Sequence, residues 1–256
     1  MVSYNYDGSF DGLLTAVFDS YSRRERIDVL SRGVMLQTNL FSDDAYSVMT
    51  DENKAVRVWN ALAKKLSKGA LGAIATAYLC TDDAGDVVVY RFVCRVIDSE
   101  QSIENDFSDA DVVQLLKNCR RVRGEAHRLL QFVRFQKAAD GTYFAMVEPL
   151  YDVLPMAIGH FRDRFSDSRF VIYDRARDYG YYYDGAVAQR MTMKSDRSHM
   201  ITGQLPEDMM DGEEKLFQQL WRTYFKSVAI QERLNPRKQR NDMPVRYWKY
   251  LTEKQL

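Results

Sequence analysis

The sequence of 256 residues is short of the features that mark many protein classes. It has three cysteines, Cys80, Cys94 and Cys119, and none of them belongs to a Cys-x-x-Cys pair. An odd and scattered set argues against a disulfide framework, a zinc ribbon or an iron–sulfur cluster held by this chain. We therefore expect reduced thiols, as is usual for a cytoplasmic protein, and no metal site.

Long apolar runs and common catalytic motifs are also missing. No apolar run is long enough to cross a bilayer, so we expect no membrane partner. The first residues, MVSYNYDGSFDG, lack the basic and apolar regions of a secretory signal. The P-loop and the GxGxxG, HExxH and GxSxG patterns do not occur, so no familiar motif identifies a reaction.

Net charge is absent as well, but only as an average. Lys and Arg number 36 and so do Asp and Glu. Residues 1–112 hold 11 basic and 18 acidic residues, a balance of −7, whereas residues 113–256 hold 25 and 18, a balance of +7. The second part has 17 of the 24 arginines. This asymmetry indicates a basic surface for a polyanion, or two blocks that pack on each other.

Residues 1–112 are predicted to form a mostly helical, acidic block. The alternation in Val2–Tyr6 predicts a short strand, and Ser9 is placed to cap a following helix. Asp51 is expected to begin a second helix that Gly69 and Gly72 interrupt. Asp86 precedes a third amphipathic stretch, although its apolar run also suits a strand.

The pattern changes period after the helix expected over residues 109–131. Alternating residues 132–136 and 142–147 predict one hairpin, and residues 169–173 and 180–184 predict a second, with a helix starting at Pro155 between them. We expect an α+β fold in which an antiparallel sheet built from hairpins is flanked by helices. A doubly wound parallel sheet is disfavoured because regular β-α-β alternation is missing.

The same pattern suggests how the chain is organised. Residues 113–185 form a helix with the hairpins, residues 186–212 a polar connector, and residues 213–256 an amphipathic helix, expected over 213–231, with a basic tail and a short helix near 244–251. We expect these parts to make one compact unit.

A first candidate site is the arginine-rich stretch of the central helix, Cys119–Arg128. Arg120, Arg123 and His127 recur at helical spacing and share one face, and guanidinium groups suit phosphate. Gly124 would let a phosphate or another helix approach closely. The alternative is a solvated face paired with the acidic residues 98–111. The phosphate-binding candidates here are Arg120, Arg121, Arg123 and Arg128.

A second candidate site is the basic tail. Residues 226–249 contain seven Lys or Arg and two acids, a balance of +5, interleaved with aromatic and amide side chains. Cations contact phosphates, aromatic rings stack on unpaired bases and amides read base edges. Alternatively, Asn235-Pro236 is only a helix cap, and the apolar residues dock the tail on the core. The candidates are Arg233, Asn235, Arg237, Lys238, Gln239, Arg246 and Trp248.

Candidate general acids or bases are scattered. They are His127, His160, Glu125 and Glu148, and no spacing selects one of them or His199. Glu125 and His127 are two residues apart, so on a helix they point to different faces. Structural roles are the alternative, and whether the chain is an enzyme stays open.

Several longer motifs, in this order, resemble a bacterial family of unknown function described as probable DNA metabolism protein. They are Tyr6-Asp-Gly-Ser-Phe-Asp-Gly-Leu13, Arg121-Val-Arg-Gly-Glu-Ala-His-Arg128, and Asn235-Pro236 followed by Met243-Pro-Val-Arg-Tyr-Trp248. The segments Phe144–Pro149, Asp152–Pro155 and His160-Phe161 also fit, whereas residues 186–211 match little. The resemblance covers nearly the whole chain.

The resemblance implies work on DNA. Members of this family are typically encoded beside a radical S-adenosylmethionine protein linked to DNA repair, and a related domain is fused to uracil-DNA glycosylase-like proteins. This implies a DNA-handling subunit for single-stranded or damaged DNA, whose partner holds the iron–sulfur cluster and S-adenosylmethionine. An enzyme acting directly on a nucleobase or the DNA backbone is one alternative, and a scaffold without nucleic-acid contact is another.

Overall fold

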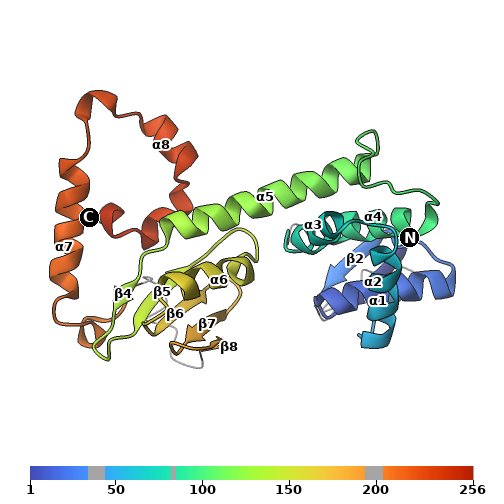
Figure 1. Cartoon of the computed structure of the whole chain (residues 1–256), viewed down its shortest axis with the longest axis horizontal. Helices are drawn as coiled ribbons and strands as arrows, with labels where there is room; N and C mark the ends of the chain where they lie inside the picture. The colour runs from blue at the N-terminus through green and yellow to red at the C-terminus, as the bar shows by residue number, and fades with distance from the viewer. Residues whose placement is uncertain (34–43, 82–84, 194–203, 256) are drawn as a thin grey trace. The chain divides into compact units, whose positions relative to one another are not determined.

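A computed structural model describes residues 1–33, 44–81, 85–193 and 204–255. The chain divides into two compact units, unit 1 (Met1–Arg123) and unit 2 (Gly124–Leu256), and the boundary lies within helix α5 (Ala110–Phe132) (Figure 1). With this boundary, unit 1 has 15 basic and 18 acidic residues, a balance of −3, and unit 2 has 21 and 18, a balance of +3. The α+β class predicted from the sequence is confirmed.

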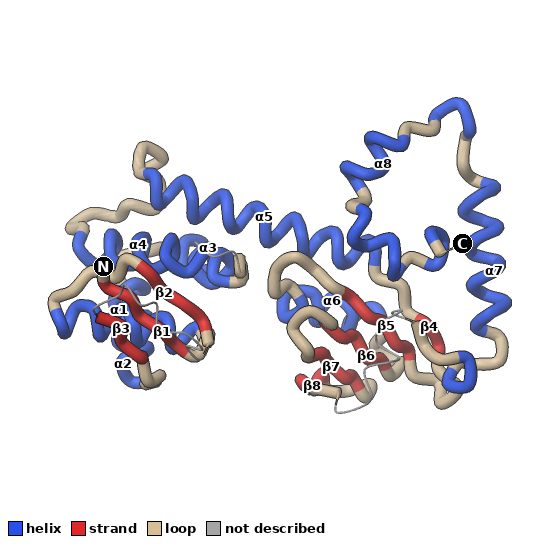
Figure 2. The backbone as a smooth tube through the Cα atoms, turned by 180° about the vertical axis from the view of Figure 1, so that it is seen from behind, coloured by secondary structure: helices blue, strands red, loops and turns tan. Residues whose placement is uncertain are grey.

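Unit 1 is a small parallel sheet with helices. Strand β1 (Val2–Tyr6) lies between β2 (Val29–Arg32) and β3 (Asp44–Ser47), and both pairings are parallel. Helices α1 (Phe10–Arg23), α2 (Glu52–Ala63), α3 (Lys68–Tyr78) and α4 (Gly85–Asp98) accompany the sheet (Figure 2). Their apolar faces and the side chains of β1 make one core.

Capping residues recognised in the sequence correctly predicted where two helices of unit 1 begin. The Ser9 Oγ accepts the Gly12 N–H at 2.9 Å, and the Asp51 carboxylate accepts the Asn53 N–H at 2.8 Å, as the sequence predicted. The expected break at Gly69 and Gly72 is wrong, because both glycines lie within α3. The break comes earlier, where Ser67 caps α3 with its Oγ accepting the Ala70 N–H. The stretch after Asp86 is helical and not a strand.

The expectation of a mostly helical first block missed the sheet. Strands β2 and β3 have four residues each, too few to show a period. In β2 only Leu30 is buried, so the strand shows no alternation of buried and exposed residues. It forms by pairing with β1, which lies more than twenty residues earlier in the chain. Parallel partners joined by crossovers leave no hairpin signature in the sequence.

Unit 2 contains a five-stranded sheet in the order β4-β5-β6-β7-β8. The strands are β4 (Gln136–Lys137), β5 (Tyr143–Val147), β6 (Phe170–Asp174), β7 (Tyr179–Tyr183) and β8 (Ala188–Met191). Helix α6 (Leu154–Arg164) connects β5 to β6, and these two strands are parallel. The sheet is therefore mixed and not wholly antiparallel as expected. The crossover helix accounts for the difference, since parallel neighbours need one.

The two expected hairpins turned out differently. The β6–β7 hairpin is confirmed, with Phe170 opposite Tyr183. The first hairpin is much shorter than predicted, because α5 continues through Phe132 and only Gln136 and Lys137 pair with β5. Strand β8 lies within the expected connector.

The last part of unit 2, residues 213–255, is here called the C-terminal arm. It consists of α7 (Glu214–Ser227), the 3-10 turn η3 (Gln231–Arg233), α8 (Pro236–Asp242), and the 3-10 segments η4 (Val245–Tyr250) and η5 (Thr252–Lys254). Figure 1 shows the arm running out along α7 and returning through α8 to η4. The amphipathic helix and the short helix near Pro244 were both expected.

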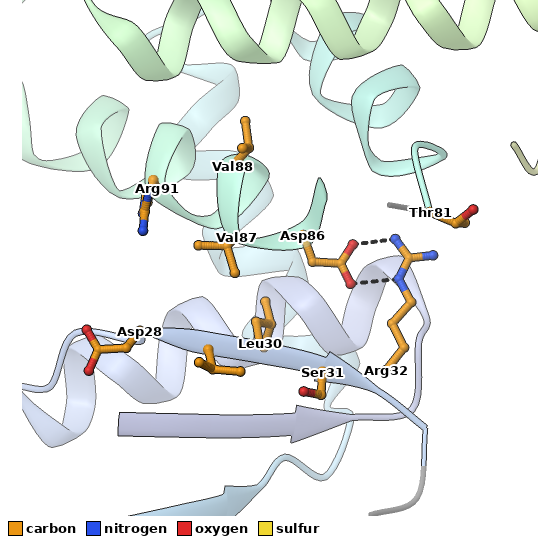
Figure 3. Close-up of a pocket in the computed structure, with 10 residues that line it drawn as sticks. Asp28, Leu30, Ser31, Arg32, Thr81, Asp86, Val87, Val88 and Arg91 are labelled. Atoms are coloured by element: carbon orange, nitrogen blue, oxygen red, sulfur yellow. Dashed lines mark hydrogen bonds and ion pairs between the residues drawn. The ribbon is translucent and has the colours of Figure 1, made fainter. Parts of the chain in front are cut away.

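A buried ion pair organises one side of unit 1 (Figure 3). The Arg32 guanidinium donates from Nε and Nη2 to the two carboxylate oxygens of Asp86, and the Tyr6 hydroxyl donates to Oδ2 of Asp86 at 2.7 Å. Nη2 of Arg32 also donates to the Tyr78 carbonyl oxygen at 2.8 Å. The pair joins β2 to α4 beside a cavity of about 670 Å³.

Replacing Asp86 with Ala should destabilise unit 1 by about 3–5 kcal/mol, because Arg32 and the Tyr6 hydroxyl would lose a buried acceptor. The matched control is Asp98→Ala, whose contacts with Arg26 and the Tyr21 hydroxyl are both exposed to solvent, and it should cost about 1 kcal/mol or less. Urea unfolding followed by Trp59 fluorescence, with the other tryptophans replaced by Phe, measures both. Equal losses in the two variants would contradict a special role for the buried pair.

Candidate nucleic-acid interface

The motifs of unit 2 meet at the carboxyl ends of β5 and β6. Because these strands are parallel, the residues that follow them, Glu148 and Arg175, lie at the same edge of the sheet. Ligands of open α/β sheets commonly bind beyond this edge. The backbone N–H of Arg175 donates to the Val147 carbonyl at 3.0 Å, which holds the two chain segments together.

Glu125 is the centre of a buried network beside this edge. Its side chain is 1% exposed. The carboxylate accepts the Leu150 N–H at 2.8 Å, the Tyr247 hydroxyl at 2.7 Å and the Arg246 guanidinium, and Arg128 lies 3.5 Å away. The central arginine motif and the tail motif, which the sequence places 121 residues apart, are therefore in direct contact.

The network keeps Glu125 ionised. Burial alone would raise its pKa, but the hydrogen bonds from Leu150, Tyr247 and Arg246 outweigh burial and hold the pKa below the ordinary value. A carboxylate in this state does not donate a proton at neutral pH, and both of its oxygens are engaged by groups of the protein. The geometry therefore assigns Glu125 a positioning role for the tail.

Glu148 has similar surroundings. Its Oε2 accepts the Tyr250 hydroxyl at 2.8 Å and the Lys249 ammonium, and Arg175 lies 3.9 Å away. Burial raises its pKa, but the bonds to Lys249 and Tyr250 outweigh this, so the pKa of Glu148 is lowered. Glu125 and Glu148 thus hold successive parts of η4: Glu125 binds Arg246 and Tyr247, and Glu148 binds Lys249 and Tyr250.

The histidines are placed apart from these carboxylates. His127 is exposed on α5, where its Nε2 lies 2.9 Å from the Gln131 amide, and His160 is exposed on α6 beside Phe161. His199 lies outside the described residues. Among the residues that the structure describes, no three His, Cys, Asp or Glu side chains gather where they could hold a metal ion.

The arginines predicted on α5 are divided between the units. Arg120 and Arg121 are exposed, and Arg123 lines a cavity of about 360 Å³ in unit 1 with Glu104. Arg128 belongs to unit 2 and lies beside Glu125. An added Cβ at Gly124 would meet no described atom within 4 Å. In the described structure, therefore, no group packs so closely on this position that it requires glycine.

Helix α8 presents the predicted basic residues of the tail to solvent. The Asn235 side chain accepts the Lys238 N–H at 2.9 Å, which is the cap expected from the sequence. Arg233, Arg237 and Lys238 are exposed, and Gln239 is half-buried. A hollow of about 610 Å³ is lined by Asn235, Arg237, Lys238, Arg240 and Asn241.

Trp248 is engaged within the protein. Its Nε1 donates to the Met243 carbonyl at 3.0 Å, and the Lys254 ammonium lies 4.6 Å from its ring centroid. The sequence did not single out Trp221, Arg134 or Glu253, which form a second cluster in unit 2. The available signal was the apolar stripe of the predicted amphipathic helix, which corresponds to α7 and is exposed at Leu216, Leu220 and Tyr224.

Comparison with known proteins places the chain in a family. Residues 84–253 match the model of a domain of unknown function, DUF4130, and the chain therefore belongs to that family. No curated protein and no solved structure matches the chain. In the described part of the chain, no helix has the length and apolar character needed to cross a membrane.

Glu125→Gln should lower the free energy of unfolding of unit 2 by about 2–3 kcal/mol at neutral pH, because the neutral amide cannot accept the charge-assisted hydrogen bonds that the carboxylate accepts. The lowered pKa means that this stabilisation exists above the ordinary pKa of 4.5 and is lost as the pH falls through the folded-state pKa. Urea unfolding at pH 7 and below pH 4 measures the difference, which should shrink in acid. Glu232→Gln, at an exposed position of the arm, is the control, and a pH-independent difference would contradict the assignment.

Proposed function

We propose that this protein is a DNA-handling subunit in DNA repair or DNA metabolism, and that it contacts DNA phosphates through the C-terminal arm. The charge distribution of unit 2 supports this proposal. Residues 213–256 contain ten basic and five acidic residues, a balance of +5, whereas residues 124–212 contain 11 and 13, a balance of −2. The positive charge of unit 2 is therefore concentrated on the arm.

The observation that carries the proposal is the exposed group on and beside α8. Arg233, Arg237, Lys238 and Arg240 project from one short stretch whose side chains are almost all exposed. Lys238 pairs with Asp242 at 2.8 Å, but both side chains are more than half exposed, so the pair opens at little cost. Exposed cations of this kind bind DNA phosphates and displace the counterions condensed on the DNA, which makes the affinity depend on salt.

The network around Glu125 supports a binding role more than direct catalysis. Arg246, Lys249 and Arg128 lie beside Glu125 or Glu148, so their charge is partly neutralised, whereas the cations of α8 are exposed and are the phosphate ligands we propose. The two carboxylates proposed as general acids or bases hold the tail in place. Chemistry on DNA then comes from a partner, and the family resemblance points to a radical S-adenosylmethionine protein that holds the iron–sulfur cluster.

The test is binding of single-stranded, duplex and lesion-bearing oligonucleotides across a salt series. Affinity should fall steeply with salt, and the double variant Arg237→Ala/Lys238→Ala should weaken binding to all sequences. For single strands, each lost phosphate contact reduces the slope of log affinity against log salt by about 0.7. Fluorescence anisotropy measures both quantities.

The matched control removes the same charge from unit 1. Arg57→Ala/Lys64→Ala replaces two exposed cations on or next to α2 and should leave the salt slope unchanged. Absence of binding at low salt, both alone and with the partner, would overturn the proposal. An equal change of slope in the two double variants would contradict the assignment to α8.

A further inference from the structure

Unit 2 contains an aromatic cavity between α7 and the segment that links α5 to β4. Its volume is about 560 Å³, and Phe135, Phe217 and Trp221 supply its aromatic surface. Phe217 and Trp221 are 59% and 39% exposed, so their rings are open to solvent although they line a concave site. Cavities of this size accommodate small organic groups.

The Trp221 ring is held in a fixed orientation. Its Nε1 donates to Oε2 of Glu253 at 2.9 Å, and Glu253, with a side chain 1% exposed, accepts Nη2 of Arg134 at 2.7 Å. A buried ion pair therefore orients an indole that remains partly uncovered. A ligand that stacks on it pays little for ordering the side chain, since the rotamer is already set.

Polar groups complete the cavity. Gln131, Gln218 and Glu214 line it together with the aromatic rings. The Glu214 carboxylate accepts the Gln218 amide at 2.9 Å and the Lys137 N–H at 3.0 Å, so its position is also fixed. Amide and carboxylate groups pair with the N–H and C=O groups on the edge of a nucleobase, while aromatic faces contact its ring.

The combination of aromatic and polar groups in the lining favours a nucleobase over an apolar peptide. The arm, with its balance of +5, supplies five of the eight lining residues, and the Arg134 guanidinium carbon lies 5.6 Å from the Trp221 ring centroid. An aliphatic protein surface would take the Glu214 carboxylate and the Gln218 amide out of water and offer them no further hydrogen bond.

We propose that this cavity binds one unpaired nucleobase of a single-stranded or opened nucleic acid, stacked on Trp221. The inference rests on the proposed DNA binding and adds the position where a base is held. Trp221 takes the stacking role that the sequence suggested for Trp248.

The three tryptophans of the chain allow a direct test. Two variants with Phe at the other positions keep only Trp221 or only Trp248. Each is titrated with a deoxythymidine strand of about twelve nucleotides and with an abasic strand of equal length and charge. The base-bearing strand should quench Trp221 fluorescence, and the abasic strand should not. Trp248 should respond to neither.

Affinity supplies an independent readout. Trp221→Ala should weaken binding of the deoxythymidine strand about tenfold, which corresponds to roughly 1.4 kcal/mol, and leave the abasic strand unaffected. Trp221→Phe should retain most of the affinity, and Trp248→Ala is the matched control. Phe217→Ala, at an exposed position, should repeat the base-dependent loss without disturbing the core.

The outcomes separate this inference from the proposed function. If both strands bind equally in the wild type and Trp221 is not quenched, the inference is overturned while DNA binding by the arm stands. If neither strand binds at low salt, alone or with the partner, the proposed function fails and the inference fails with it. Equal losses for both strands in Trp221→Ala would also overturn the base-binding role.

Discussion

The buried carboxylate of Glu125 is the constraint on which the arrangement of unit 2 depends. An ionised group that is 1% exposed has to be fully paired, and here its partners come from the loop after β5 and from η4 as well as from its own helix. Removing any partner would leave charge in a place where water cannot solvate it. The path of the tail against α5 therefore follows from the hydrogen-bonding needs of one side chain.

The basic residues of unit 2 fall into two groups, those paired with carboxylates inside the protein and those exposed to solvent. Arg246, Lys249 and Arg134 lie within 4 Å of carboxylates that are buried or half-buried, so they act mainly inside the protein. The cations of α8 project into solvent and have their charge available to a polyanion. With the unit boundary inside α5, the charge contrast is −3 against +3, less than the ±7 found at residue 112, because the basic residues 117–123 belong to unit 1. The charge difference that bears on DNA binding lies within unit 2, between the arm at +5 and residues 124–212 at −2.

Local chemistry made part of the structure predictable. Ser9, Asp51 and Asn235 cap helices because each cap involves only residues two or three positions away. The parallel pairs β1–β2 and β5–β6 were missed, since their register depends on contacts distant in sequence. The motifs around Glu125 and Arg246 could each be identified from the sequence. Their contact could not, because it joins residues 121 positions apart. Trp221 escaped notice because its partner Glu253 lies 32 residues further along the chain.

The exposed apolar stripe of α7 has a thermodynamic consequence. Leu216, Phe217, Leu220 and Tyr224 are each more than half exposed, so burial of these side chains contributes little to holding the helix folded. Local opening of such a helix takes less free energy than opening of β5 or β6, whose side chains are largely buried. A ligand that covers the stripe would therefore also slow amide hydrogen exchange along α7, far beyond the residues it touches.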